Sequence, residues 1–312
     1  MGEFDLIRRY FQRPAGVGVE VGVGDDCAVL APTPGARWLV SSDMLVEGRH
    51  FLSTVDPARL GHKALAVNLS DLAACGATPR GFTLALALPR VDDAWLAGLS
   101  RGLFALADAH ACPLVGGDTT QGPLNLCITV FGEALAGQAL LRSGARVGDD
   151  IWVSGRLGDA RLALEVFRGA VALAGDGFTQ VRAAMECPTP RVALGQALRG
   201  IATAVIDVSD GLLGDLGHIL AASGVGARID VDALPRSAVL AAQAAGLQRV
   251  CVLAGGDDYE LVFTAPPQAR LPDVGVPLTR IGCIEAEPGL RVVDAHGAAV
   301  DHGLRSFDHF AS

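Results

Sequence analysis

The chain has 312 residues and a formal net charge of −9, from 25 Lys and Arg against 34 Asp and Glu. This acidic balance argues against a nucleic-acid-binding surface. The longest apolar stretches, such as 82–89, are far shorter than the roughly 20 residues that a membrane span needs. Half of the residues are hydrophobic, which excludes a disordered chain and allows two domains of ordinary size. The 7 cysteines form no C-x-x-C pair, which indicates reduced thiols in a soluble, cytoplasmic protein.

Short apolar strand patterns alternate with Ala- and Leu-rich helical patterns along the first half of the chain. The expected elements are a helix at 4–11, strands at 26–31 and 37–42, a helix at 57–75, a strand at 82–88, a helix at 92–109, and strands near 114 and at 124–134. The polar, glycine-containing segment 135–150 follows them. It predicts an N-terminal domain of residues 1–140 and a C-terminal domain of residues 141–312.

The second half resumes the same alternation of strand and helix patterns. The expected elements are a strand at 151–154, helices near 159–168 and 190–199, a strand at 203–208, a helix at 212–222, a strand near 227–231, a helix around 237–245, and strands at 250–253 and 260–264. The order of these elements predicts an α+β protein made of two mixed α/β domains.

Several aspartates follow glycine or serine at the ends of apolar segments. The segments are GDD at 24–26, SSD at 41–43, NLSD at 68–71, GGDTT at 116–120, DVSDG at 207–211 and GGDD at 255–258. A single aspartate of this kind is usually a turn former or a helix cap. Asp71 and Asp207, however, interrupt apolar segments, where an unpaired charge would be costly. The set as a whole therefore indicates a functional site.

Carboxylates gathered in one cleft repel each other unless cations neutralise them, and hard oxygen ligands suit Mg²⁺. The adjacent Gly-Gly steps let backbone N–H groups approach phosphate oxygens. Lys63 is the only lysine and ends no glycine-rich loop, so the Walker phosphate loop is absent. The acid spacing of a calcium EF-hand is absent too. The residues predict a magnesium-dependent enzyme that acts on phosphate groups.

Other interpretations of the same residues stay open at this point. Paired carboxylates could serve a glycosidase, although only 5% of the residues are aromatic. A serine hydrolase would need the G-x-S-x-G elbow, which does not occur. His50 in GRHF could bind a substrate phosphate, but a packed histidine is the simpler interpretation of its residue type.

Taken together, the motifs resemble those of the thiamine-monophosphate kinase family. Its superfamily also holds aminoimidazole ribonucleotide synthetase, selenophosphate synthetase and the hydrogenase maturation factor HypE. The resemblance covers nearly the whole chain, and its most specific parts are HKALAVNLSDLAACGATP at 62–79 and DVSDGLLGDLGHI at 207–219. The segment SSDMLVEGRHF at 41–51 separates this kinase from the rest of the superfamily. The resemblance implies that the γ-phosphoryl group of ATP is transferred to thiamine monophosphate, which gives thiamine diphosphate.

The resemblance also implies a homodimer that pairs its N-terminal sheets, with a C-terminal α+β domain covering the ATP cleft. The implied Mg²⁺ ligands are Asp26, Ser41, Ser42, Asp43, Asp71, Asp118, Asp207 and Asp210. The implied ATP-binding residues are Gly117, Asp118, Arg142 and Ser209. Thiamine monophosphate would face His50, Asp257 and Phe307. Phosphoryl transfer would depend on Asp43, Asp71, Asp118 and Arg142.

This chain departs from the family pattern at a few of these positions. Asp257 replaces a glutamate of the family, and Phe307 replaces a tyrosine. Met44, which follows Asp43, replaces a threonine. The implied mechanism needs no general base, because the attacking phosphate oxygen is already anionic. The alternatives within the superfamily are a sister ATPase with another acceptor and a non-catalytic HypE-like maturation factor. The sequence ends in FDHFAS, without the cysteine-bearing tail expected of such a factor.

Overall fold

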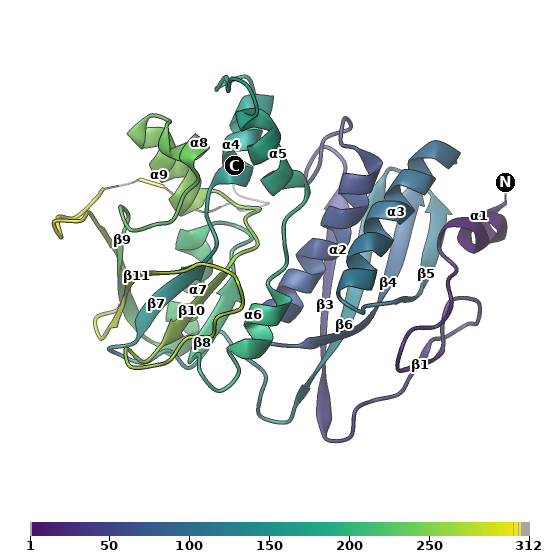
Figure 1. Ribbon diagram of the computed structural model, residues 1–312, viewed down its shortest axis with the longest axis horizontal. Helices are drawn as coiled ribbons and strands as arrows, with labels where there is room; N and C mark the ends of the chain where they lie inside the picture. The colour runs from purple at the N-terminus through teal and green to yellow at the C-terminus, as the bar shows by residue number, and fades with distance from the viewer. Residues whose placement is uncertain (1, 302, 305, 307–312) are drawn as a thin grey trace. The chain divides into compact units, whose positions relative to one another are not determined.

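The computed structural model describes residues 2–301, 303–304 and 306. The chain divides into two compact units, each of mixed α/β structure (Figure 1). Unit 1 comprises Met1–Leu72 and Ala77–Gly137, and unit 2 comprises Ala73–Gly76 and Gln138–Ser312. Among the described residues, no helix combines the length and the apolar character that crossing a membrane requires. The predicted fold of two mixed α/β domains is confirmed.

Unit 1 is built on a four-stranded sheet with the strand order β3-β6-β4-β5. Its strands are β3 (Ala36–Val46), β4 (Thr78–Leu88), β5 (Leu114–Gln121) and β6 (Asn125–Leu135). The helices α2 (Pro57–Ala74) and α3 (Asp93–Ala109) lie over one face of this sheet (Figure 1). The first elements of the chain are α1 (Glu3–Tyr10), β1 (Val19–Val21) and β2 (Val29–Leu30).

The two faces of the unit 1 sheet differ in exposure. On the face that the helices cover, Leu45 of β3 and Ile128 of β6 are buried. The residues that alternate with them point to the other side of the sheet. There Val40 and Met44 of β3 are 58% and 53% exposed. The sheet therefore has one core face and one apolar face that is open to solvent in the single chain.

Unit 2 is built on a six-stranded sheet with the order β12-β9-β11-β7-β10-β8, in which only β12 and β9 are parallel. Its strands are β7 (Asp150–Ser154), β8 (Ala204–Asp207), β9 (Gly226–Asp230), β10 (Leu261–Ala265), β11 (Leu278–Glu285) and β12 (Gly289–Val293). Its helices are α4 (Asp159–Phe167), α5 (Gly177–Glu186), α6 (Val192–Ala197), α7 (Leu212–Ser223), α8 (Ala238–Ala241) and α9 (Ala245–Ala254). Every residue of β10 is buried, and α7 packs against β8, β12 and α9.

Most of the expected elements are present, but the strand predicted at 250–253 is wrong. These residues form the last turn of α9, and Cys251, Val252 and Leu253 are all buried there. A short apolar run cannot distinguish a buried strand from a buried helix end. The structure also adds elements that the sequence did not predict, namely β1, α5, α9, β11 and β12.

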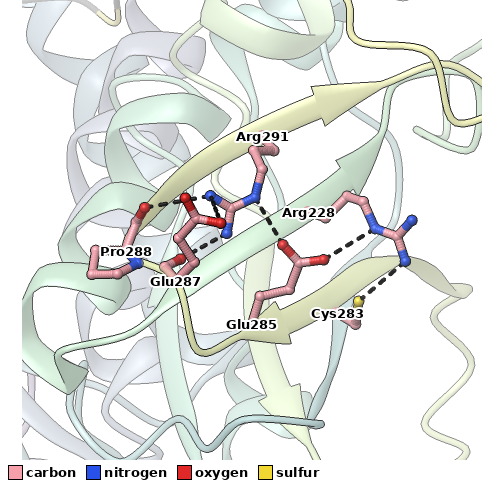
Figure 2. A network of polar contacts seen from close by, with 6 residues as sticks. All are labelled: Arg228, Cys283, Glu285, Glu287, Pro288 and Arg291. Carbon is pink, nitrogen blue, oxygen red and sulfur yellow. Dashed lines mark hydrogen bonds and ion pairs between the residues drawn. The ribbon is translucent and has the colours of Figure 1, made fainter.

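The edge of the unit 2 sheet carries a network of charged side chains (Figure 2). Glu285 of β11 pairs with Arg228 of β9 at 3.3 Å and with Arg291 of β12 at 2.8 Å. Arg291 also donates to the Glu287 carbonyl at 2.7 Å, and Arg228 lies 4.0 Å from the Cys283 sulfur. Exposed ion pairs add little to stability, but charges on an edge strand oppose pairing with another sheet. We therefore interpret this network as structural.

Candidate active site

In unit 1, hydrogen bonds join α2 to β3 at the predicted metal-binding residues. The Ser41 hydroxyl donates to the Asp71 carboxylate at 2.5 Å, and the Asp43 backbone N–H donates to the Asn68 side-chain oxygen at 3.1 Å. The Asn68 amide also donates to the Ala64 carbonyl at 3.0 Å, so its own helix orients it. The structure thus brings Ser41, Asp43 and Asp71 to one helix–strand boundary.

Asn68 is a residue of this site to which the sequence interpretation gave no role. It is 1% exposed and lies on the apolar face of α2, three residues after Leu65 and four before Leu72. A polar side chain at that spacing is the signal that could have identified it. A buried amide must satisfy its hydrogen bonds, and Asn68 does so by fixing the backbone at Asp43.

The loop after β3 carries His50, whose ring is oriented by the backbone. The Val46 N–H donates to His50 Nδ1 at 3.0 Å, so the proton of the neutral ring is assigned to Nε2. The only lysine, Lys63 of α2, is 4% exposed and donates to the His50 carbonyl at 3.4 Å. His50 is thus a half-buried residue with a defined ring orientation.

Gly117 and Asp118 lie on β5, at the other edge of the same sheet. The strand register aligns Asp43 with Ile128, Leu84 and Gly117 in one row across the sheet. Three strand spacings separate the ends of this row by about 14 Å. Gly117 has φ +144°, and a Cβ there would lie 2.0 Å from the Leu84 carbonyl oxygen, so only glycine fits. This glycine therefore has a packing reason of its own.

Two other predicted ligands of unit 1 lie apart from the Ser41–Asp71 pair. Ser42 projects from the opposite face of β3, where its hydroxyl lies 3.0 Å from the Thr129 hydroxyl and donates to the Ile128 carbonyl at 3.1 Å. Asp26 is exposed between β1 and β2, and its backbone N–H donates to the Asp25 carboxylate at 2.8 Å. No hydrogen bond between described residues joins Asp26 to another predicted ligand.

In unit 2, two turns lie side by side at one end of the antiparallel pair β8 and β10. We call them the β8 turn (residues 208–211) and the β10 turn (residues 255–260). The Asp257 backbone N–H donates to the Ser209 carbonyl at 2.8 Å. The structure thus brings together one residue predicted to bind ATP and one predicted to bind thiamine monophosphate.

The β10 turn contains an unusual backbone conformation. Asp257 and Tyr259 have φ values of +66° and +51°, which residues other than glycine seldom adopt. The Tyr259 hydroxyl donates to the Asp257 carboxylate at 3.0 Å, and its backbone N–H donates to the Val208 carbonyl at 2.8 Å. Such conformations cluster at functional sites. Tyr259 is a second residue that the sequence interpretation did not identify, and it fixes the orientation of the Asp257 carboxylate.

The acids that flank Tyr259 have structural partners in unit 2. The Asp258 carboxylate accepts the Gly158 N–H at 2.9 Å, and burial raises the pKa of Asp258 well above its ordinary value. Glu260 accepts hydrogen bonds from Arg191 at 2.6 Å and from the Ser154 hydroxyl at 2.5 Å. Asp258 and Glu260 are thus hydrogen-bonded within unit 2, and Asp257 remains the acid of this turn that the sequence predicts to bind the substrate.

The β8 turn joins the predicted metal ligands Asp207 and Asp210 to α7. Asp207 is buried at the end of β8, whereas Asp210 is exposed. Asp215 of α7 is 3% exposed and accepts the backbone N–H groups of Asp210 and Gly211 at 3.2 and 3.0 Å. Burial, and then the nearby Asp210 carboxylate, raise the pKa of Asp215 to about 7.

The structure does not bring Arg142 together with Ser209 in unit 2. Arg142 is exposed, and its carbonyl accepts the hydroxyl of Ser223, the last residue of α7, at 3.4 Å. The β8 turn precedes the first residue of α7. A helix of this length spans about 18 Å, which separates the backbone of Arg142 from the β8 turn.

Phe307, the third residue predicted to bind thiamine monophosphate, lies outside the described residues.

The donor atoms gathered at these positions are carboxylate and hydroxyl oxygens. Among the residues that the structure describes, no three His, Cys, Asp or Glu side chains lie close enough to hold a metal ion by themselves. Mg²⁺ typically binds one or two carboxylates together with water and substrate phosphates. The donor set therefore suits Mg²⁺ that is bound along with a phosphate ligand.

Two family models match the chain, one in each half. Residues 24–134 match the N-terminal domain of AIR synthase related proteins, and residues 146–295 match their C-terminal domain. The fold and the acidic turns thus define a protein of the AIR synthase related class.

Comparison with individual proteins narrows this class. The chain is 47% identical to the thiamine-monophosphate kinase of Salmonella typhimurium, with 100% of this chain and 99% of that protein covered. The crystal structure of the thiamine-monophosphate kinase from Stenotrophomonas maltophilia K279a is 44% identical, with a TM-score of 0.85 and coverage of 95% and 96%. A complex of AaThiL with AMPPCP and TMP is 29% identical, with a TM-score of 0.80 and coverage of 90% and 89%. The chain belongs to the thiamine-monophosphate kinase family, as the sequence resemblance predicted.

Proposed function

We propose that this protein catalyses the ATP-dependent phosphorylation of thiamine monophosphate to thiamine diphosphate. The observation that carries the proposal is the full-length likeness to thiamine-monophosphate kinases at 47% identity. The AaThiL complex with AMPPCP and TMP supports both substrates, because AMPPCP is an analogue of ATP. The reaction is a direct transfer of the γ-phosphoryl group, and we propose that it takes place in the cytoplasm.

The oxygen donors of both units fit Mg²⁺ chemically. The ligands proposed in unit 1 are Asp26, Ser41, Ser42, Asp43, Asp71 and Asp118, and those proposed in unit 2 are Asp207 and Asp210. Of these, Ser41 and Asp71 are hydrogen-bonded to each other at 2.5 Å. When bound, Mg²⁺ would neutralise the repulsion between the phosphates of the two substrates.

The protein's own side chains bind and orient the two substrates. Asp257, held by Tyr259, recognises a polar edge of thiamine monophosphate away from its phosphate, and His50 offers its Nε2 proton as a donor. Ser209 and the Gly117–Asp118 step lie along the phosphates of ATP, and Arg142 binds a phosphate as the only cation of the set. A phosphate oxygen of the acceptor is anionic at neutral pH, so no side chain has to remove a proton from it.

We also propose that the unit 1 sheets of two chains pair in a homodimer, with unit 2 covering the ATP cleft. The exposed apolar residues Trp38, Val40 and Met44 of β3 support this pairing, because an isologous contact would bury them. Analytical ultracentrifugation is expected to give twice the mass of one chain. Val40→Asp should shift the protein to monomer, whereas Phe4→Asp, at an exposed position on α1, should not. A wild-type monomer with full activity would refute the dimer.

The reaction itself is tested by incubating the protein with ATP, Mg²⁺ and thiamine monophosphate and separating the products by chromatography. We expect thiamine diphosphate and ADP in equal amounts. ADP and free phosphate without thiamine diphosphate would instead indicate a sister ATPase with another acceptor. Nucleotide binding with no turnover at all would indicate a HypE-like factor.

A further inference from the structure

The first turn of α7 lacks the side chain that normally caps a helix. Its N-cap residue is Gly211, with φ +116° and no capping hydrogen bond. A Cβ at this position would lie 3.0 Å from the backbone of Ala254. The residues that usually accept the first N–H groups of a helix, such as Ser and Asp, are therefore disfavoured here by conformation and by space.

Asp215 reaches back from within the helix to the two residues that precede it. Its side chain is 3% exposed, and one carboxylate oxygen, Oδ2, accepts both the Asp210 N–H at 3.2 Å and the Gly211 N–H at 3.0 Å. These two donors are the last residues of the β8 turn. A buried carboxylate thus accepts two hydrogen bonds from the turn that carries Ser209 and Asp210.

Two other segments attach to the same turn of helix. The Ser209 carbonyl accepts the Asp257 N–H at 2.8 Å, which couples the β8 turn to the β10 turn. Ser306 accepts the Gly214 N–H at 2.7 Å and donates to the Gly211 carbonyl at 3.3 Å. Displacement of the β8 turn would therefore be transmitted to the Asp257 backbone and to Ser306.

We infer that Asp215 is a positioning residue, which sets Ser209 and Asp210 for the nucleotide and, through the Ser209–Asp257 hydrogen bond, sets the turn that recognises the acceptor. This inference rests on the proposed function. One oxygen accepts both N–H groups, so the amide oxygen of an asparagine can take its place. Alanine leaves both N–H groups without this acceptor, which is costly for the buried Gly211 N–H.

The test compares Asp215→Ala and Asp215→Asn with Asp92→Ala. Asp92 is the matched control, because it caps α3 in unit 1 by accepting the Trp95 N–H at 3.0 Å and has no link to either turn. Asp215→Ala is expected to raise the KM for both ATP and thiamine monophosphate by about 10- to 100-fold. Asp215→Asn should stay within about threefold of the wild type, and Asp92→Ala should lower Tm without changing either KM.

A binding measurement separates this inference from the proposed function. Titration of AMPPCP with Mg²⁺ by calorimetry, without any acceptor, should show the same weakening in Asp215→Ala as the KM for ATP. Suppose that the wild type makes no thiamine diphosphate but Asp215→Ala still weakens AMPPCP binding. Then thiamine monophosphate is not the substrate that accepts the phosphoryl group, and the positioning role of Asp215 holds. If Asp215→Ala fails to fold, Asp215→Ser replaces it with the same expectation, because its shorter side chain cannot reach both donors.

The inference is overturned by either of two results. The first is an alanine variant that lowers Tm but leaves both KM values and the AMPPCP affinity unchanged, as a helix cap without a positioning role would. The second is an asparagine variant as impaired as the alanine variant, which would mean that the hydrogen bonds to the β8 turn are not the reason for the effect.

Discussion

The two units hold their candidate residues on different kinds of structure. In unit 1, Ser41, Asp43 and Asp71 lie on a regular strand and a regular helix, which are joined by hydrogen bonds of 2.5 and 3.1 Å. In unit 2, Ser209 and Asp257 lie on turns, one of which contains two residues with positive φ. Rigid elements hold charged groups at fixed positions, whereas turns present recognition groups. This difference is the basis of our proposal that unit 1 supports phosphoryl transfer and that the β10 turn of unit 2 selects the acceptor.

The largest expected effect is that of Asp71→Asn in unit 1. It removes a charge, keeps the acceptor for the Ser41 hydroxyl and changes the volume little, so Tm should hardly change. We expect kcat at saturating Mg²⁺ to fall by about 10³-fold or more, because the carboxylate proposed to hold Mg²⁺ beside the phosphates is lost. Asp108→Asn on α3, where the side chain is 63% exposed, is the control. Near-normal turnover in Asp71→Asn would remove this residue from the site.

The next largest effect is on the free energy of unfolding, through the ion pair between Arg191 and Glu260 of the β10 turn. Glu260 is 6% exposed, and Arg191→Met would leave its carboxylate buried with only the Ser154 hydroxyl as a side-chain partner. Breaking a buried ion pair in this way costs about 3–5 kcal/mol in the free energy of unfolding. Arg8→Met, which breaks the exposed pair with Asp5, should cost less than about 1 kcal/mol. Denaturant titration of both variants checks the difference, and equal values would show that the Glu260 pair is not structural.

Loss of the Tyr259 hydroxyl in the β10 turn should have a smaller effect, which is confined to the binding of thiamine monophosphate. Tyr259→Phe removes the donor that orients Asp257. The KM for thiamine monophosphate should rise by about three- to tenfold, with kcat and the KM for ATP unchanged. The chain's other tyrosine provides the control, because Tyr10→Phe breaks only a 3.4 Å contact with the Asp93 carbonyl in unit 1. A Tyr259→Phe effect on kcat alone would contradict the recognition role.

The smallest effect is the pH dependence of stability at Glu133 in unit 1. Burial alone would raise the pKa of Glu133, but hydrogen bonds from Thr33 and Arg80 outweigh it and hold the pKa below its ordinary value of 4.5. A depressed folded pKa contributes stability above that ordinary value and loses it as the pH falls through the folded pKa. Tm should therefore fall more steeply below pH 4.5 in the wild type than in Glu133→Gln. Parallel curves would contradict the coupling.

The sequence predicted those parts of the fold that depend on local pattern. The helix expected at 57–75 is observed at Pro57–Ala74, because its apolar residues recur at helical spacing. The prediction of a strand at 250–253 was wrong, because a buried helix end and a buried strand are equally apolar. The nearly full-length resemblance predicted the family, because its motifs extend over most of the chain.

Contacts that depend on the conformation of a turn could not be predicted from the sequence. Asp215 matters through N–H groups that precede its own helix, and Tyr259 through a carboxylate two residues away in a turn of unusual conformation. Neither contact follows from residue type or spacing. The separation of Arg142 from Ser209 within unit 2 follows from the length of α7, which lies between them, and sequence motifs give no distance between distant segments.

The central claim is that the β10 turn selects the acceptor, and steady-state kinetics of Asp257→Ala test it most directly. Asp257→Asn is the companion variant, because asparagine tolerates the positive φ of +66° and keeps one acceptor oxygen. We expect Asp257→Ala to raise the KM for thiamine monophosphate by about 10- to 150-fold, with the KM for ATP nearly unchanged and a smaller loss in Asp257→Asn. An unchanged KM for thiamine monophosphate in Asp257→Ala, with only a lowered Tm, would contradict the account.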